Sequence, residues 1–464
     1  MSQTLRIAGG TLVTEREAIP RDLLIQDGRV QAQLPPNEFA AVDEILDARG
    51  RYVLPGLIDP HVHFNSPFMG TVTVHDYYTG SRAAAFGGVT CFIDFSTQVK
   101  GASLLENLAQ KEEEATGRAL IDWSMHGILL DADEHTVSEI PRLIEAGCPT
   151  FKCFTTYKAA GRMVDDYAIL KLLKPIADNG GMLMVHCEDD ALIEFYRTRE
   201  LDAGHVAPIY HARSRPPIVE NEAIRRLSIL VAQIPTPTYV VHTSTKESVA
   251  LVHAARERGL PFHSETCTHY LALTEEALTR PNGEMFICSP PLRSAEDVEA
   301  LWRGLAENKI EVVSTDDAGV PTADRLRLGG GRFDRVPNGM PGIEPRLFLL
   351  YSLGVLPGRI TMPQLVAQSS TNAARLFGPY PRKGNLEPGA DADVVIFDPT
   401  PQWTMSAGTL HMNTDFCPFE GIPVTGRVET VFSRGEVIIR DGELVAPPGR
   451  GQRVRRALDS KQTL

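Results

Sequence analysis

Two histidines separated by one residue, His61 and His63, stand in the segment D-P-H-V-H at residues 59–63. If this segment ends a β-strand, alternation along the strand places both imidazoles on one face. Paired imidazoles suit a divalent transition metal such as zinc. Three further candidate ligands end or follow other apolar, β-rich runs: His186, His242 and Asp316. One such residue alone would usually be structural, but five in equivalent places predict a metal centre.

The number of candidate ligands predicts two metal ions. Four histidines and one aspartate exceed the three protein ligands plus water that a catalytic zinc uses. Two divalent ions roughly 4 Å apart need an anion between them. Lys152 lies in the β-rich run 150–154, and carbon dioxide would convert its amine into a carbamate with two oxygens, one for each ion. This hypothesis requires Lys152 to point into the fold; the alternative is a surface lysine or an ion-pair partner.

The middle of the chain must supply the elements that position these residues. Eight apolar, β-rich runs predict strands at residues 57–63, 89–95, 122–130, 150–154, 182–186, 239–242, 261–265 and 310–315. Helical patterns lie between them, for example at 104–116, 166–179, 221–233, 246–258 and 295–307. This repetition predicts parallel strands, and eight units over about 320 residues predict an α/β fold, a (β/α)8 TIM barrel. Barrel enzymes place their chemistry at the carboxyl ends of the strands, where the candidate ligands stand.

Both ends of the chain show short β-prone runs separated by tight-turn signals, such as Asp27-Gly28 and Asp441-Gly442. Neither end has enough strands for a stable sandwich alone. We therefore predict one small β-sandwich built from residues 1–55 and 379–464, with the barrel formed by residues 56–378. The basic segment 450–456 in the C-terminal tail is expected to be a solvated terminus, with a subunit contact as the alternative.

Composition disfavours several classes of partner. The 464 residues include 46 Lys and Arg against 59 Asp and Glu, a net charge of −13. This balance argues against nucleic-acid binding and against attraction to anionic membranes. No apolar run approaches the length of a membrane span, and the N-terminus lacks the pattern of a secretory signal. Seven cysteines without a C-x-x-C pair predict reduced thiols in a cytoplasmic protein.

Several segments, in this order, resemble those of cyclic amidohydrolases: G-L-I-D-P-H-V-H, F-K-C-F-T-T-Y-K, V-H-C-E-D-D, V-V-H-T-S, E-T-C-T-H-Y, C-S-P-P-L-R and P-N-G-M-P-G-I-E-P-R. D-P-H-x-H alone marks the wider amidohydrolase superfamily, whereas F-K-x-F-x-x-Y-K and P-N-G narrow the resemblance to the hydantoinase/dihydropyrimidinase group. The resemblance covers nearly the whole chain. It implies a metal-dependent hydrolase that opens the cyclic amide bond of a hydantoin or dihydropyrimidine ring.

The resemblance also implies a role for each candidate residue. One ion, expected to be zinc, would be held by His61, His63 and Asp316, and the other by His186 and His242. Carboxylated Lys152 would bridge the two ions, together with the hydroxide that attacks the ring. Three further residues match substrate-contacting positions: Tyr157 on the attacked carbonyl oxygen, and Ser289 and Asn338 on the ureide edge. Asp316 would pass the hydroxide's proton to the leaving nitrogen. Members of the group are commonly homotetramers or homodimers.

The chain departs from the family pattern at three places. Asp317-Ala318 follows Asp316 where the family usually has His or Gln and then Cys. Asp317 is expected to be a solvated loop acid, with an effect on the site as the alternative. Thr268-His269 is similar to allantoinases and dihydroorotases, and His269 is expected to be structural. The loop 64–78 after the first barrel strand has its own sequence.

The same residues bear on the substrate. Five side chains are candidates for an apolar pocket around the ring substituent: Phe64, Phe68, Met69, Phe154 and Tyr157. The arginine by which dihydroorotases grip a carboxylate directly follows their H-x-H motif, and Phe64-Asn65 stands there instead. Two alternatives are kept: a related enzyme such as an allantoinase, and a non-catalytic dihydropyrimidinase-related protein. Every ligand position is filled, which disfavours the second.

Overall fold

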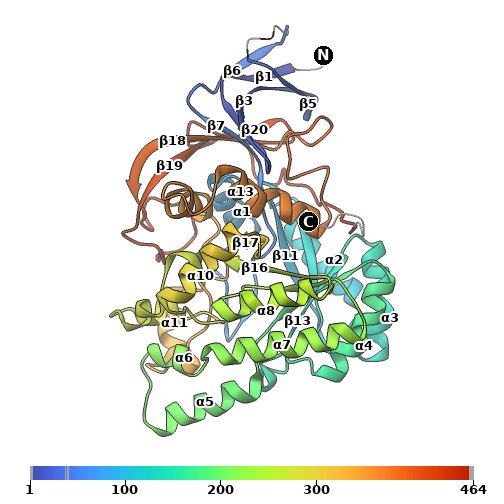
Figure 1. The fold of residues 1–464 in the computed structure, drawn as a ribbon, viewed down its shortest axis with the longest axis vertical. Helices are drawn as coiled ribbons and strands as arrows, with labels where there is room; N and C mark the ends of the chain where they lie inside the picture. Colours follow the sequence, from blue (N-terminus) through green and yellow to red (C-terminus); the bar gives the residue numbers. More distant parts are fainter. Residues whose placement is uncertain (1–3, 37, 39–40, 459–464) are drawn as a thin grey trace.

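The computed structural model describes residues 4–36, 38 and 41–458. Strands from both ends of the chain form a β-domain at one end of the molecule, and the middle of the chain forms a barrel wrapped in helices (Figure 1). Among the described residues, no helix combines the length and the apolar character needed to cross a bilayer.

The barrel consists of eight parallel strands that are neighbours in chain order. They are β8 (Leu57–Asp59), β11 (Val89–Thr97), β12 (Asp122–Ile128), β13 (Thr150–Phe154), β14 (Met182–His186), β15 (Thr238–Val240), β16 (Phe262–Cys267) and β17 (Val312–Ser314). All eight predicted strands are present, and the predicted TIM-barrel class is confirmed. Three strands end before their candidate ligands. His242 and Asp316 adopt φ values of 43° and 47°, a left-handed backbone that a strand cannot continue.

Arg346 closes the barrel between its first and last strands. Its side chain is fully buried, and Nη1 donates to the carbonyl oxygens of Ile58 and Val313, each at 2.9 Å. Just beyond the ends of these two strands, Val62 and Asp317 form an isolated parallel bridge. The loop after β8 and the loop after β17 therefore lie side by side.

Helices cover the outside of the barrel. The longer ones are α1 (Tyr77–Phe86), α2 (Leu104–Ala115), α3 (Glu134–Glu145), α4 (Asp166–Asp178), α5 (Asp190–Asp202), α7 (Pro217–Gln233), α8 (Lys246–Glu257) and α10 (Ala295–Ala306). The shorter ones are α6 (Ile209–Arg213), α9 (Thr268–Ala272), α11 (Thr322–Gly329), α12 (Arg346–Leu349), α13 (Met362–Val366) and α14 (Asn372–Phe377). The five predicted helices are confirmed. The start of α7 lies four residues earlier than predicted, because Pro217 at its first turn needs no amide partner.

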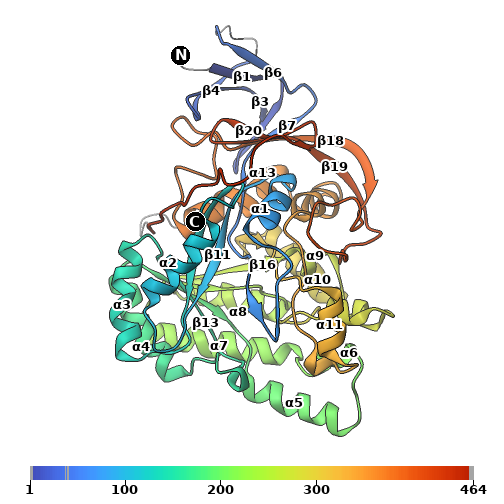
Figure 2. The ribbon, with the colours of Figure 1, turned by 180° about the vertical axis from the view of Figure 1, so that it is seen from behind.

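The β-domain joins strands that are far apart in the sequence (Figure 2). One sheet has the order β5 (Arg29–Leu34), β4 (Asp22–Gln26), β1 (Thr4–Ala8) and β6 (Glu44–Asp47). The other has the order β21 (Glu443–Leu444), β20 (Glu436–Arg440), β19 (Pro423–Ser433), β18 (Val394–Thr404), β7 (Tyr52–Pro55), β2 (Thr11–Val13) and β3 (Ala18–Pro20). Since β7 pairs directly with β18, the prediction of one β-domain built from both ends is confirmed.

The predicted solvated tail is wrong. Residues 450–456 run along the beginnings of the barrel strands, where Val454 donates its amide to the carbonyl of Trp123 at 2.7 Å. Arg456 is 2% exposed. Its guanidinium donates to Ser124 Oγ at 2.8 Å and to Thr150 Oγ1 at 2.9 Å, and also to two backbone carbonyls. The basic side chain is buried because it meets polar acceptors at the start of β12 and β13.

Replacement of Arg456 by alanine is therefore expected to lower the free energy of unfolding by about 3 kcal/mol, because several buried acceptors lose their donor. Urea denaturation of the purified protein measures this change. Arg455→Ala is the matched control, since this exposed neighbour donates to the Glu145 carbonyl, and it should change the stability by no more than about 0.5 kcal/mol. Equal effects of the two variants would contradict the expectation.

Candidate metal centre

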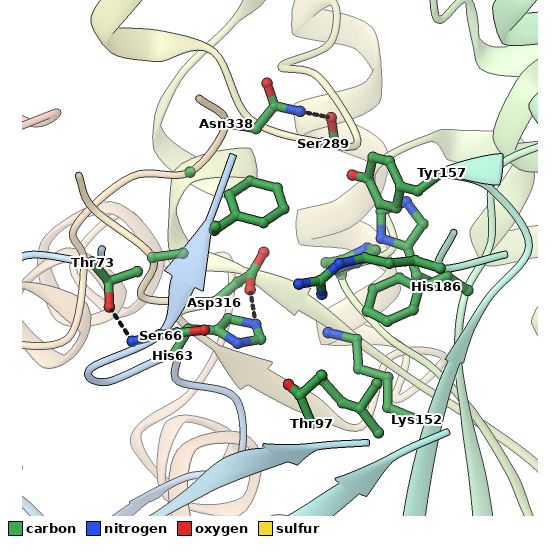
Figure 3. A pocket seen from close by; sticks show the side chains of 17 residues that line it. His63, Ser66, Thr73, Thr97, Lys152, Tyr157, His186, Ser289, Asp316 and Asn338 are labelled. Atoms are coloured by element: carbon green, nitrogen blue, oxygen red, sulfur yellow. Dashed lines mark hydrogen bonds and ion pairs between the residues drawn. The ribbon is translucent and has the colours of Figure 1, made fainter. Parts of the chain in front are cut away.

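The six predicted metal-site residues converge at the carboxyl end of the barrel. His61 and His63 follow β8, Lys152 lies in β13, and His186 ends β14. His242 and Asp316 follow β15 and β17. In Figure 3, Lys152 and His186 point toward the same space as His63 and Asp316, while Ser289 and Asn338 lie at its other end.

Three of these residues form a compact group of donors. Asp316 Oδ1 lies 3.0 Å from His61 Nε2 and 3.2 Å from His63 Nε2, and ligand atoms of all three lie within 4.8 Å of one another. Burial alone would raise the pKa of Asp316, but His61 and His63 hold it well below its usual range. Burial lowers the pKa of His63 to about 4. Asp316 is therefore a carboxylate and His63 a neutral imidazole at neutral pH, the protonation states that metal ligands require. Burial and Lys152 oppose protonation of His61, but Asp316 and Glu265 raise its pKa.

A second pair of imidazoles lies next to this group. The ring centroids of His186 and His242 are 4.5 Å apart, and His242 is stacked 5.7 Å from His61. His242 Nδ1 is buried and has no hydrogen-bond partner in the part of the chain that the structure describes. A buried polar nitrogen without a partner is unfavourable, and a cation in the cavity would remove that cost. The imidazole and carboxylate donors fit divalent ions of the zinc type.

Two buried glutamates orient the histidines from behind. Glu265 Oε1 lies 2.5 Å from His61 Nδ1, so this nitrogen donates, and Nε2 points to Asp316 and Lys152. Glu188 Oε2 lies 2.7 Å from His186 Nε2 and also accepts from Arg215 at 2.8 Å. Burial would raise the pKa of Glu188, but Arg215 and His186 lower it to about 2. Sequence reasoning missed both glutamates, although each stands inside a quoted motif, V-H-C-E-D-D or E-T-C-T-H-Y.

Lys152 points into the barrel. Its side chain is 2% exposed, and Nζ lies 2.8 Å from His61 Nε2 and 4.5 Å from the centre of the Phe95 ring. The alternative of a surface lysine is therefore wrong. Burial lowers the pKa of Lys152 to about 8, which increases the neutral, nucleophilic fraction of the amine.

The three predicted substrate-contacting residues line the same cavity. Tyr157 follows β13 with a φ of 66°, a backbone strain typical of functional sites. Burial raises its pKa to about 12, so the phenol keeps its proton at neutral pH. Asn338 Nδ2 donates to Ser289 Oγ at 2.8 Å.

The apolar pocket contains only part of the predicted set. Phe68, Phe154 and Tyr157 line the cavity with the metal ligands, whereas Met69 lines a cavity that adjoins it. Phe64 is fully buried on the other side of its loop and packs against Phe92, with ring centroids 5.0 Å apart. Phe64 lines neither of these two cavities, so its predicted role is wrong.

Asp317 is not a solvated loop acid. It is 1% exposed, and its carboxylate accepts from His75 Nδ1 at 2.8 Å and from the amides of Gly342 and Ile343 at 2.7 and 2.9 Å. These donors make Asp317 a junction between three loops beside the cavity. His269 is buried against Tyr270, and its Nε2 has no hydrogen-bond partner among the described residues, so its structural role stays a prediction.

Comparison with known proteins gives the class. The Amidohydrolase family matches residues 52–438. A D-hydantoinase of Geobacillus stearothermophilus is 41% identical over 98% of this chain and 97% of its own. A D-hydantoinase of Streptomyces coelicolor is 40% identical over 98% and 99% of the two chains. The crystal structure of a dihydropyrimidinase from Brevibacillus agri superposes with a TM-score of 0.96 at 39% identity, covering 99% of this chain and 100% of that one.

The barrel, the buried histidines and these matches define a metal-dependent hydrolase, and the chain belongs to the amidohydrolase family. Within that family it is a cyclic amidohydrolase of the hydantoinase group, with a divalent metal centre. The resemblance and the enzyme class predicted from the sequence are confirmed.

Glu265→Gln is expected to weaken metal binding by about 10- to 100-fold, because the amide is a poorer acceptor for the ring N–H of His61. Metal content after equilibration with a competing chelator measures the effect. Glu311→Gln makes the same chemical change in a buried glutamate at the opposite end of the barrel, and it should leave metal affinity unchanged. An unaltered affinity in Glu265→Gln would show that this carboxylate does not tune the site.

Proposed function

We propose that this protein opens the ring of hydantoins and dihydropyrimidines with two divalent ions, in the first instance zinc, and a carboxylated Lys152. The observation that carries the proposal is the buried amine of Lys152, 2.8 Å from His61 Nε2, among histidines and an aspartate that end neighbouring strands. The D-hydantoinases and the dihydropyrimidinase to which the chain is similar support the choice of substrate.

We assign His61, His63 and Asp316 to one ion and His186 and His242 to the other. Divalent ions supply Lewis acidity and lower the pKa of water from 15.7 towards about 7. Without an anion, the ammonium of Lys152 would repel them. Its neutral amine adds to carbon dioxide, a nitrogen–carbon bond forms, and the amine proton leaves to solvent. The product would be a carbamate, and its two oxygens would supply the anionic ligand that two divalent ions require.

The remaining residues act on the ring. Protonated Tyr157 donates a hydrogen bond to the carbonyl oxygen as negative charge develops there. Asn338 donates to Ser289 Oγ at 2.8 Å, which orients the serine toward the cavity, and we assign the serine hydroxyl to the ureide edge. Asp316 takes a proton from the attacking water and gives it to the leaving ring nitrogen, so that the ring opens to a carbamoylated product.

An allantoin-type ureide is the second candidate, favoured by the sequence Thr268-His269.

We further propose a cytoplasmic location. All seven cysteines are buried free thiols, which supports a reducing compartment. We also propose assembly as a homotetramer or homodimer, on the family resemblance.

A substrate panel tests the reaction. Metal-loaded protein is expected to hydrolyse 5-substituted hydantoins or dihydrouracil faster than allantoin, and chelation should abolish the activity until zinc is restored. Lys152→Ala should lower the rate by at least about 10³-fold, because the bridging anion is lost. Added acetate or formate should restore part of that rate. Lys171→Ala, a lysine outside the site that donates to the Ala132 carbonyl, is the control. Full activity in Lys152→Ala would overturn the carbamate.

Tyr157→Phe is expected to lower kcat by about 10²- to 10³-fold, the usual effect of removing one donor to a developing oxyanion. Its metal content should stay that of the unmodified protein, which separates loss of the donor from loss of the centre. Tyr167→Phe, at a side chain that is 74% exposed, serves as the control. A kcat within about threefold of the unmodified enzyme would remove Tyr157 from the mechanism.

A further inference from the structure

A second cavity adjoins the metal cavity and leads away from it. Four residues line both cavities: Phe68, Tyr157, Arg162 and Asn338. Tyr157 and Asn338 are the residues assigned to the ring. A substituent that leaves the ring toward the outer cavity therefore passes the other two, Phe68 and Arg162.

Arg162 differs from the other arginines of the outer cavity. Arg197 pairs with Glu194 at 2.6 Å, and Arg215 pairs with Glu188 at 2.8 Å. Arg162 is partly buried, and its guanidinium carbon lies 5.7 Å from the centre of the Phe68 ring. Within residues 4–36, 38 and 41–458, no carboxylate lies within ion-pair distance of it. Burial is the largest influence on its pKa and lowers it, as expected for a cation without a compensating anion.

The acids of the outer cavity contact partners other than Arg162. Asp190 accepts from the Lys158 amide and from Thr156 Oγ1, both at 3.1 Å. Glu194 pairs with Arg197, and Asp334 is paired with Arg332 at 2.9 Å. The guanidinium therefore faces the junction of the two cavities with its donors available to a ligand.

We propose that Arg162 binds a carboxylate carried by the exocyclic substituent of the ring, so that the preferred substrates are anionic cyclic ureides. The planar guanidinium offers a fork of N–H donors that matches a carboxylate, and the Phe68 face holds its plane by a cation–π contact. This inference rests on the proposed ring-opening function and names the substrate class within it.

The position of Arg162 places the carboxylate on the substituent and not on the ring. The ureide edge is assigned to Ser289 and Asn338, and the attacked carbonyl to Tyr157. Arg162 lies where the ring cavity continues into the outer one. The residues directly after His63 are Phe64 and Asn65, and neither offers a cation to a ring carboxylate.

The test compares an acid with its amide. 5-(Carboxymethyl)hydantoin and 5-(carbamoylmethyl)hydantoin have nearly the same shape and differ by one charge, and 5-(2-carboxyethyl)hydantoin extends the chain. Dihydroorotate and dihydrouracil form the matching pair for a carboxylate on the ring. For each compound, kcat/KM is measured by hydrolysis and Kd by calorimetry.

Three variants accompany the unmodified protein. Arg162→Gln removes the charge at similar length, and Arg162→Lys keeps the charge but loses the fork. Lys158→Gln removes one charge from an exposed side chain of the same loop. Because metal ions also attract carboxylates, only the part of the acid preference that Arg162→Gln removes counts for the proposal.

The unmodified protein should prefer the acid, and Arg162→Gln should lower kcat/KM for the acid by about 10- to 100-fold and for the amide by less than about threefold. The kcat/KM of Arg162→Lys for the acid should lie between that of Arg162→Gln and that of the unmodified protein. Lys158→Gln should match the unmodified protein on both compounds. Equal losses on acid and amide, or no preference in the unmodified protein, would overturn the proposal. An Arg162-dependent preference confined to dihydroorotate would overturn the placement on the substituent.

The two proposals can fail separately. Hydrolysis of neutral hydantoins without an acid preference keeps the proposed function and rejects the role of Arg162. Tighter binding of the acid that Arg162→Gln abolishes, with no hydrolysis of any ureide, keeps the role of Arg162 and rejects the proposed function.

Discussion

One buried carboxylate ties together the strand ends on which the metal centre depends. Glu265 in β16 accepts hydrogen bonds from Nδ1 of His61, the hydroxyl of Tyr239 and the amide of His242. His61 follows β8, and Tyr239 and His242 belong to β15 and the loop after it, so a single carboxylate holds the imidazole of His61 and the backbone at His242. A buried carboxylate is stable only when such donors surround it. The orientation of the ligands therefore depends on a contact between β16 and the segment that follows β8.

The barrel and its candidate ligands could be predicted because the same strand–helix pattern repeats along the sequence. Apolar runs separated by helical patterns predict all eight barrel strands, because a strand buried on both faces must be apolar along its length. The histidines at 61, 63, 186 and 242 stand out because imidazoles at strand ends have few structural reasons to recur. Lys152 could be predicted as part of the metal centre because two cations need an anion between them, and a carbamate on its amine would be that anion. The fold class and the convergence of the candidate ligands thus follow from local pattern and charge.

The parts that could not be predicted depend on contacts between loops. Asp317 appears solvated in the sequence, yet His75 and two amides from residues 342–343 surround it. The sequence places Phe64 next to the metal ligands, yet its ring packs against Tyr77 and Phe92. The tail 450–456 has the composition of a free terminus, and its acceptors at Ser124 and Thr150 lie more than 300 residues earlier. The local sequence pattern does not predict such contacts, because each contact depends on where two distant segments of the chain meet.

The pairing of β7 with β18 has a consequence for how the protein is made. Pro55 and Val394 are neighbours in the sheet, yet a ribosome adding roughly 5–20 residues per second needs roughly 20 to 70 s to reach the second after the first. Throughout that time the edge of β7 lacks its final partner, and an unpaired strand edge invites association with other chains. The β-domain thus makes completion of the fold wait for the last quarter of the chain. Expression at a lower temperature or with chaperones would act on this interval, far from the metal centre and without changing its chemistry.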